Sequence, residues 1–166
     1  MMDMNESEAG PLQRRTGNSF LLAQIGAHAS GRFAQRIAEL GMTPAQTGLL
    51  RLVAQQPGQS QQVLAQQLRT PPSRLVPLVD HLEERGLIER RRNPEDRRYY
   101  ALYLTAKGGQ FMKARLGPIG IAHEDDICAA LTTAERDQLH GLLSRIGEQQ
   151  GLIPGVHPGY QQLKAP

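Results

Sequence analysis

A cluster of arginines between residues 85 and 98 is the feature of the sequence that most clearly implies chemistry. The segment contains six arginines against three acidic residues, Glu89, Glu95 and Asp96, and so carries a net charge of +3. The whole 166-residue chain has the same formal net charge of +3. Arginine pairs with phosphate and enters the narrow, strongly negative minor groove of DNA. The cluster therefore predicts contact with an anionic partner, and DNA is the leading candidate.

The middle of this segment combines turn residues with charge. Asn93-Pro94-Glu95-Asp96 is typical of a type I turn with proline at its second position, and the alternation over residues 97–104 predicts a return strand. Arg97 and Arg98 follow the turn directly, so a thin hairpin would project them away from the core. We expect Asp96 to pair with Arg98 or Arg97 and to fix the tip, because a carboxylate holds a guanidinium bidentately.

Helices are predicted on both sides of the hairpin. Apolar residues recur three or four positions apart, as on one face of a helix, in the segments before residue 85 and after residue 105. The resulting order is one long helix, three short helices, a hairpin and two longer helices, which is the order of a winged helix-turn-helix with additional terminal helices. The helices are expected to start near Asn18, Thr43, Ser60, Pro71, Thr105 and Thr132. Thr43, Ser60, Thr105 and Thr132 are expected to cap their helices, Thr43 in a capping box with Gln46, and Pro118 is expected to kink the helix after Thr105.

The expected fold class is mainly α with a small β-hairpin wing. The apolar stripes of the first and last helices lie outside the winged unit and need a partner, for which a symmetric homodimer is the simplest solution. We expect a disordered segment over 1–17, an N-terminal dimerisation helix over 18–42, a DNA-binding winged helix-turn-helix over 43–104, C-terminal dimerisation helices over 105–151 and an irregular tail over 152–166.

The stretch from Leu78 to Gly108, LVDHLEERGLIERRRNPEDRRYYALYLTAKG, resembles the signature of the MarR family of bacterial transcriptional regulators. The upstream stretches ELGMTPAQTGLLRLV and SQQVLAQQL also fit the family, and the resemblance covers roughly Leu21 to Gly151. It implies obligate dimers that bind palindromic operators in double-stranded DNA. Such dimers usually repress transcription and are often released by a small phenolic or otherwise aromatic ligand.

The resemblance also assigns roles by position. About Pro71 to Arg85 would be the recognition helix, from which four residues approach the major groove. Arg97 and Arg98 would enter the minor groove. Arg90 and Arg92 could contact backbone phosphate, although a merely solvated strand face stays open for both. The four residues of the recognition helix are Ser73, Arg74, Val76 and Pro77.

Pro77 departs from the polar or basic residue that many family members carry at this position. Inside a helix it removes one backbone hydrogen bond and clashes with the preceding turn, at a cost on the order of 3 kcal/mol unless the helix bends. Either the helix starts near Ser73 or it kinks at Pro77, and we favour the kink. Base readout would then depend on Arg74, because arginine with guanine is the commonest specific pairing.

Candidate sensing residues are fewer. His28, Arg32 and Arg51 could line the ligand pocket that the resemblance implies, but a histidine simply flanking the dimer surface is the simpler interpretation of His28. Cys128 lies between apolar residues, which favours an inert thiol over a redox switch. The stretch from His123 to Asp126 has helical spacing for metal ligands, yet a solvated helix face is the simpler interpretation.

Other function classes find little support in the sequence. We see no phosphate-binding loop, paired-carboxylate motif or nucleophile elbow, so neither catalysis nor a cofactor or metal is expected. One cysteine allows no intramolecular disulfide, and no apolar run is long enough for a membrane span, so a cytoplasmic protein is expected. The alternatives are a winged helix that binds protein rather than DNA, and a redox-responsive regulator acting through Cys128. His157 and Tyr160 in the tail could fold over the partner subunit or remain disordered.

Overall fold

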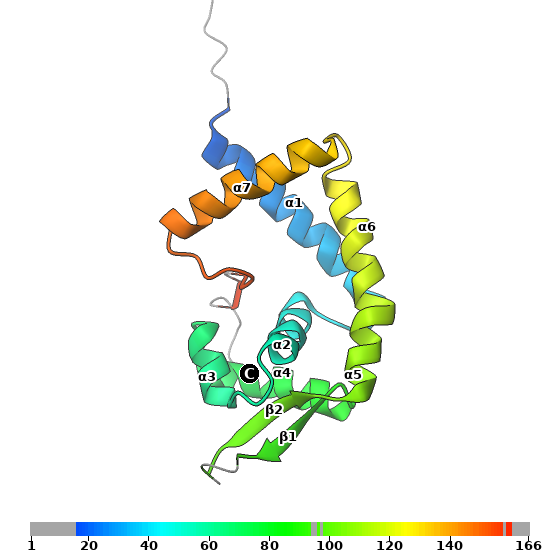
Figure 1. Cartoon of the computed structure of the whole chain (residues 1–166), viewed down its shortest axis with the longest axis vertical. Helices are drawn as coiled ribbons and strands as arrows, with labels where there is room; N and C mark the ends of the chain where they lie inside the picture. The colour runs from blue at the N-terminus through cyan, green and yellow to red at the C-terminus, as the bar shows by residue number, and fades with distance from the viewer. Residues whose placement is uncertain (1–15, 94–95, 97, 158, 161–166) are drawn as a thin grey trace, which may run out of the picture.

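The computed structural model describes residues 16–93, 96, 98–157 and 159–160. The chain is mainly helical with one antiparallel hairpin, which confirms the expected fold class (Figure 1). Of the segment 1–17, which the sequence predicts to be disordered, residues 1–15 lie outside the described part, whereas Gly17 is the N-cap of α1. Residues 94, 95 and 97 also lie outside the described part. The elements are α1 (Asn18–Ala38), α2 (Pro44–Gln55), α3 (Gln61–Gln67), α4 (Pro72–Glu84), β1 (Ile88–Arg92), β2 (Tyr100–Leu104), α5 (Ala106–Phe111), the π-helical turn η1 (Met112–Leu116), α6 (Gly117–Ile127) and α7 (Thr133–Gln149).

The lobe at the bottom of Figure 1 packs α2, α3 and α4 around a core that the hairpin closes. The capping box predicted at the start of α2 is present: Thr43 Oγ1 accepts the Gln46 N–H at 3.2 Å, and Gln46 Oε1 accepts the Thr43 N–H at 2.9 Å. These bonds satisfy helix N–H groups that would otherwise lack partners. The fully buried side chains of the lobe are Leu49, Leu50, Val53, Leu64, Leu75, Val79, Leu82, Leu87, Ile88 and Leu102.

Helix α4 begins at Pro72 and continues through Pro77. Its first turn therefore accepts a proline, whose missing N–H costs nothing there, while the second proline lies inside the helix. Leu75, Val79 and Leu82 form the buried face, and Val76 and Pro77 are exposed on the opposite side. The helix thus presents its outer face at the surface of the lobe.

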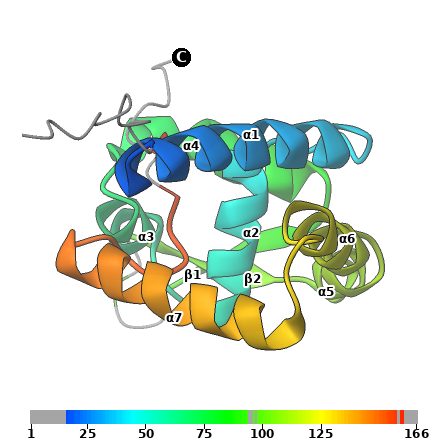
Figure 2. The same cartoon turned by 90° about the horizontal axis from the view of Figure 1, so that it is seen from above.

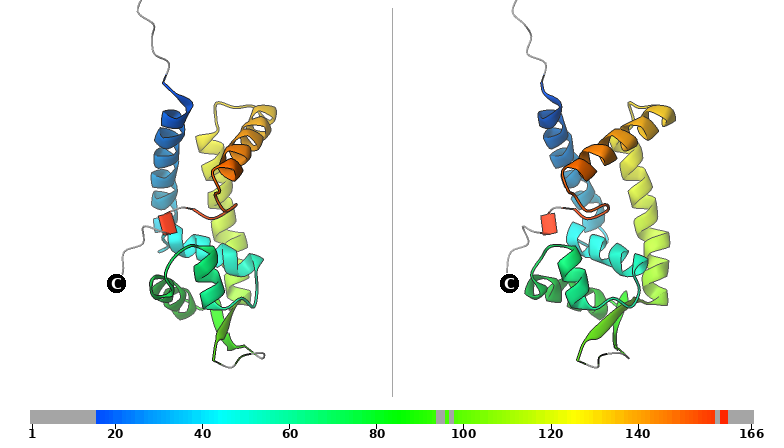
Figure 3. Two further views of the ribbon diagram at one scale, coloured as in Figure 1. Left: turned by 90° about the vertical axis from the view of Figure 1, so that its left-hand side faces the viewer. Right: turned by 60° about the vertical axis from the view of Figure 1, so that its left-hand side comes forward.

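A continuous helical column of α5, η1 and α6 rises from the base of the hairpin to the upper helices (Figure 3). The irregularity expected at Pro118 takes the form of the π-helical turn directly before it, where the N–H of Gly117 donates to the Met112 carbonyl five residues back. At the top, α1 packs against α6, and seen from above α1 and α7 lie on opposite sides of α2 (Figure 2).

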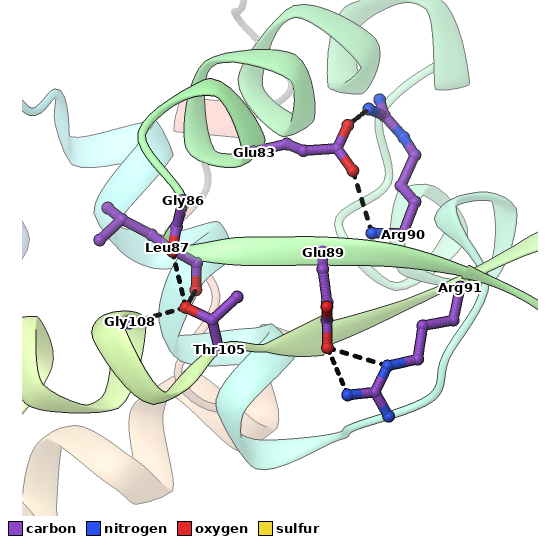
Figure 4. A network of polar contacts seen from close by, with 8 residues as sticks. All are labelled: Glu83, Gly86, Leu87, Glu89, Arg90, Arg91, Thr105 and Gly108. Carbon is purple, nitrogen blue, oxygen red and sulfur yellow. Dashed lines mark hydrogen bonds and ion pairs between the residues drawn. The ribbon is translucent and has the colours of Figure 1, made fainter.

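One close junction fixes the hairpin to this column (Figure 4). The Thr105 hydroxyl donates to the Gly86 carbonyl at 2.6 Å and accepts the Gly108 N–H at 2.9 Å, while the Thr105 N–H donates to the Leu87 carbonyl at 3.1 Å. Gly108 is buried directly against that carbonyl, and a Cβ there would overlap the Leu87 oxygen and come within 2.8 Å of Leu104 Cδ1. The first turn of α5 can therefore approach β1 this closely only with glycine at 108.

Replacing Gly108 with alanine should destabilise the protein by about 3 kcal/mol, because backbone rather than a flexible side chain has to move. Gly109→Ala is the matched control, since its Cβ would make only an ordinary 3.8 Å contact with Leu104. That variant should be neutral or stabilising by up to about 1 kcal/mol. Urea unfolding followed by circular dichroism measures both, and equal midpoints for the two variants would show that the junction tolerates a side chain.

Candidate nucleic-acid interface

The outer face of α4 and the hairpin form one surface at the bottom of the molecule (Figure 1). On α4, Ser73, Val76 and Pro77 are exposed and Arg74 is half-buried. In the hairpin, β1 pairs antiparallel with β2 in a register that runs from Ile88 opposite Leu104 to Arg92 opposite Tyr100. The structure therefore brings the four predicted recognition-helix residues to the same side as the predicted arginine-bearing wing.

The tip of the hairpin is shaped by Asp96. Its carboxylate accepts Arg98 Nε at 3.0 Å, Arg98 Nη2 at 2.8 Å and the Arg98 backbone N–H at 3.1 Å, so the expected bidentate pair is present. These hydrogen bonds lower the pKa of Asp96, which keeps the pair charged at any pH above the ordinary aspartate range. The Arg98 side chain nevertheless stays 81% exposed, so the pair orients the guanidinium without burying it. Arg97, the other predicted minor-groove residue, lies outside the described residues.

Arg90 has a different environment from the one expected. Its guanidinium pairs with Glu83 of α4, and its backbone N–H donates to Glu83 at 3.0 Å (Figure 4). The guanidinium also pairs with Asp80 of the same helix. Burial acts against the charge, but the hydrogen bonds from Asp80 and Glu83 outweigh it and raise the pKa of Arg90. These two ion pairs connect β1 to α4, and only 20% of the Arg90 side chain remains exposed. The phosphate contact predicted for Arg90 stays a prediction. Arg92 is exposed, so its guanidinium is more accessible for such a contact.

Two other arginines of the cluster are also bound within the chain. Arg85 donates to the carbonyls of Gly41 at 3.1 Å and Leu40 at 3.0 Å, just after the end of α1, and its guanidinium lies over Phe111. Arg91 pairs with Glu89 and lies 4.4 Å from the ring centre of Tyr103. Sequence reasoning missed the contacts of Arg85 and the contact of Arg91 with Tyr103, because these join residues whose proximity depends on the fold.

A cavity of about 250 Å³ lies where α1, α2 and the helical column meet. Of the three predicted ligand-binding residues, Arg51 lines it, whereas His28 and Arg32 do not. Arg32 instead donates to Asp126 of α6 at 2.6 Å, and His28 is exposed on α1. The residues lining the cavity are Phe33, Thr47, Arg51, Met112, Leu116, Gly117 and Gly120.

The remaining candidates from the sequence have structural partners. The Cys128 thiol donates to Glu124 at 3.4 Å, and burial together with this carboxylate raises the pKa of Cys128, which disfavours the thiolate needed for oxidation. Asp126 accepts hydrogen bonds from Arg32 and Arg36, and His123 packs against Phe33. Within the described ranges, no group of three histidine, cysteine or acidic side chains is arranged to hold a metal ion. None of the described helices is long and apolar enough to cross a membrane.

Comparison with known proteins identifies the family. Residues 40–98 match the profile of the MarR family. A putative transcriptional regulatory protein for the hcr operon of Thauera aromatica is 37% identical over 153 residues, which span 92% of this chain and 90% of that protein. The chain belongs to the MarR family. It is accordingly a DNA-binding transcriptional regulator, as the resemblance in its sequence implied.

Solved structures of MarR regulators share the fold. A crystal structure of MarR is 26% identical and superposes with a TM-score of 0.72 over 85% of this chain and 95% of that one. The transcriptional repressor CouR bound to a 23-mer DNA duplex is 31% identical, with a TM-score of 0.70 over 79% of this chain and 92% of that one. A MarR family protein of Mycobacterium tuberculosis in complex with salicylic acid is 25% identical, with a TM-score of 0.64 over 82% of this chain and 100% of that one.

The contrast between Arg90 and Arg92 gives a test of their roles. Arg90→Ala should lower the free energy of unfolding by about 1.5 to 3 kcal/mol, the usual contribution of hydrogen bonds to a charged group. Arg92→Ala should leave the free energy of unfolding unchanged. If Arg92 neutralises one phosphate in the wild type, the plot of log binding constant against log salt concentration should become shallower by about 0.9 in the variant. Urea unfolding and fluorescence anisotropy measure the two quantities. If Arg92→Ala lowered stability and Arg90→Ala did not, Arg92 would be the structural arginine and the assigned roles would be wrong.

Proposed function

We propose that the protein is a homodimeric repressor that binds a palindromic operator and is released by a small aromatic ligand. The observation that carries the proposal is the exposed Arg98 held by Asp96 at the tip of a hairpin that α4 and Arg90 keep in place. An arginine fixed in this way suits a narrow negative groove, because little side-chain freedom is lost on binding. The 31% identical repressor bound to a DNA duplex supports the same use of the fold.

The dimer is supported by apolar side chains that the single chain leaves exposed. They lie on α1 and α7, the two helices farthest from the hairpin (Figure 1), and large apolar side chains left exposed in such numbers mark an interaction site. A second copy of the chain would cover it by two-fold symmetry. The exposed residues are Phe20, Leu21, Leu22, Ile25, Leu142, Leu143 and Ile146.

In the proposed complex each α4 enters the major groove and each hairpin follows the adjacent minor groove. Ser73, Arg74, Val76 and Pro77 face the base edges and phosphates, and Arg98 with Arg97 occupies the minor groove. Arg92 lies along the strand where backbone phosphate would pass. In a symmetric dimer the two α4 helices would lie about one DNA turn apart, near 34 Å.

The ligand would bind in the cavity at Arg51. Phe33 and Met112 offer apolar contacts for a ring, Arg51 offers a cation for a carboxylate, and Thr47 Oγ1 is buried with no hydrogen-bond partner among the described residues. The salicylic acid complex of the 25% identical relative supports an aromatic acid as the ligand class. Because the cavity joins the upper helices to the lobe, a ligand there would alter the spacing of the two α4 helices. It can do so only by binding one spacing more tightly than the other.

Asp96→Asn tests the DNA-binding assignment against simple electrostatics. The change makes the chain more positive, yet specific affinity should fall about tenfold, or about 1.4 kcal/mol, because Arg98 loses the group that orients it. Glu95→Gln removes the same charge one residue earlier and should leave affinity equal or slightly higher. Anisotropy titrations with the DNA upstream of the protein's own gene measure both. Tighter binding by both variants alike would show that only net charge matters at the hairpin.

Arg51→Leu tests the ligand site, with salicylate as the probe. Affinity for salicylate should fall about tenfold, which corresponds to about 1.4 kcal/mol, because the carboxylate loses its cation. DNA affinity without salicylate should stay unchanged, since Arg51 is not among the residues proposed to contact DNA. Isothermal titration calorimetry and anisotropy give the two values, and undiminished salicylate binding would place the ligand elsewhere.

A further inference from the structure

The segment after α7 folds back onto the lobe of its own chain. Gly151 ends α7 with φ +68°, and the chain then descends from the upper helices toward α2 (Figures 1 and 3). Ile153 and Val156 are half-buried, and Val156 packs against the core. The described residues 151–157 and 159–160, called the strap from here on, thus connect a helix of the proposed dimer surface with the DNA-reading lobe.

Tyr160 anchors the strap in the core. Only 4% of this residue is exposed, and its hydroxyl donates to the Ala45 carbonyl of α2 at 2.5 Å. Burial raises the pKa of the Tyr160 phenol, so it remains a neutral hydrogen-bond donor. A tyrosine near the end of an irregular segment is ordinarily exposed, whereas this one is part of the same core as Leu49 and Leu75.

The space for Tyr160 depends on a glycine inside α2. A Cβ at Gly48 would overlap the Tyr160 hydroxyl and would lie 3.2 Å from Cζ and 3.3 Å from Cε2. Glycine inside a helix is about 1 kcal/mol less favourable than alanine, so nothing in α2 itself calls for it. The contact with Tyr160 gives Gly48 a structural reason.

The strap makes further contacts on either side of this anchor. His157 Nδ1 accepts the Gly159 N–H at 2.9 Å, so Nε2 carries the ring proton and lies 3.4 Å from Ser30 Oγ on α1. At the other end, Arg69 in the turn between α3 and α4 donates to the Gly151 carbonyl at 3.5 Å. The strap therefore contacts α1, α2 and the turn that leads into α4.

We propose that the strap locks the DNA-reading lobe to the upper helices, with Tyr160 packed on Gly48 as the point of attachment. Because the strap joins α1 and α7 to the turn before α4, it restricts how far the lobe moves relative to the dimer surface. Releasing Tyr160 would loosen the lobe, and two loosened lobes match a fixed half-site spacing less well. The effect on DNA rests on the proposed function, whereas docking of the strap does not.

Gly48→Ala in the full-length chain is the test. The added methyl group overlaps the Tyr160 hydroxyl but should strengthen α2, so release of the strap is separable from unfolding of the lobe. Hydrogen–deuterium exchange should show that the amides of the strap lose protection in Gly48→Ala and keep it in the control Gly109→Ala. Tyr160→Phe in the Gly48→Ala background removes the overlapping oxygen and should restore most of the protection.

Specific DNA affinity is measured on the same four proteins, with the DNA upstream of the gene and a scrambled duplex. Gly48→Ala should bind the specific duplex about fivefold more weakly or worse, the lower end of typical coupling between sites, and the double variant should recover. Unchanged protection in Gly48→Ala, or reduced protection with unchanged affinity, would overturn the proposal. A wild type that does not distinguish the two duplexes would instead refute the proposed function and the coupling with it, while the exchange data would still decide whether the strap is docked.

Discussion

The contact between the first turn of α5 and the Leu87 carbonyl is the constraint on which the rest of the structure depends. Gly108 admits the carbonyl where any side chain would overlap it, and the Thr105 hydroxyl bonds both sides of the same junction. The base of the hairpin is thereby fixed to the helical column that leads to the upper helices. Arg90 then fixes the side of the hairpin to α4 through Asp80 and Glu83. Wing, recognition helix and column are thereby joined to one another, an arrangement that suits the proposed reading of two grooves at once.

The arginine cluster has a divided role. Its net charge of +3 suggests a surface devoted to an anion, but Arg85 and Arg90 are used to join elements of the lobe to one another. Arg92 and Arg98 remain at the surface, and Arg98 is oriented by a carboxylate that reduces the local charge. Orientation and charge therefore contribute separately at the tip. Asp96 weakens the long-range attraction between the tip and an anionic partner, but it fixes the direction of the Arg98 guanidinium.

Much of the architecture was predictable because its signals are local. The capping residues Thr43, Ser60, Thr105 and Thr132 each accept the N–H three residues on, as their spacing predicted, and the pair between Asp96 and Arg98 joins residues only two apart. The contacts that sequence reasoning missed join distant residues. Arg90 finds Asp80 and Glu83 only after β1 has folded along α4, and Tyr160 reaches Ala45 across 115 positions of the chain. The reason for a glycine at position 48 becomes visible only once Tyr160 is known to pack against it.

The upper helices and the lobe are connected at two places along α2. The cavity at Arg51 opens toward the helical column, and the strap covers α2 through Gly48 and Ala45. A ligand in the first and a docked tyrosine in the second would act on the same degree of freedom, the position of the lobe. Under the proposed function, this shared target would let a ligand in the cavity influence DNA binding without touching the hairpin.

Hydroxyl-radical footprinting on the DNA upstream of the gene tests the central claim most directly, because it reports which minor-groove positions the protein covers. The account predicts two protected regions related by two-fold symmetry, whose outer minor-groove protections disappear in Arg98→Ala while the inner protections remain. An unsymmetrical footprint, or outer protections that persist without Arg98, would contradict the assignment of the hairpin to the minor groove of a palindromic operator.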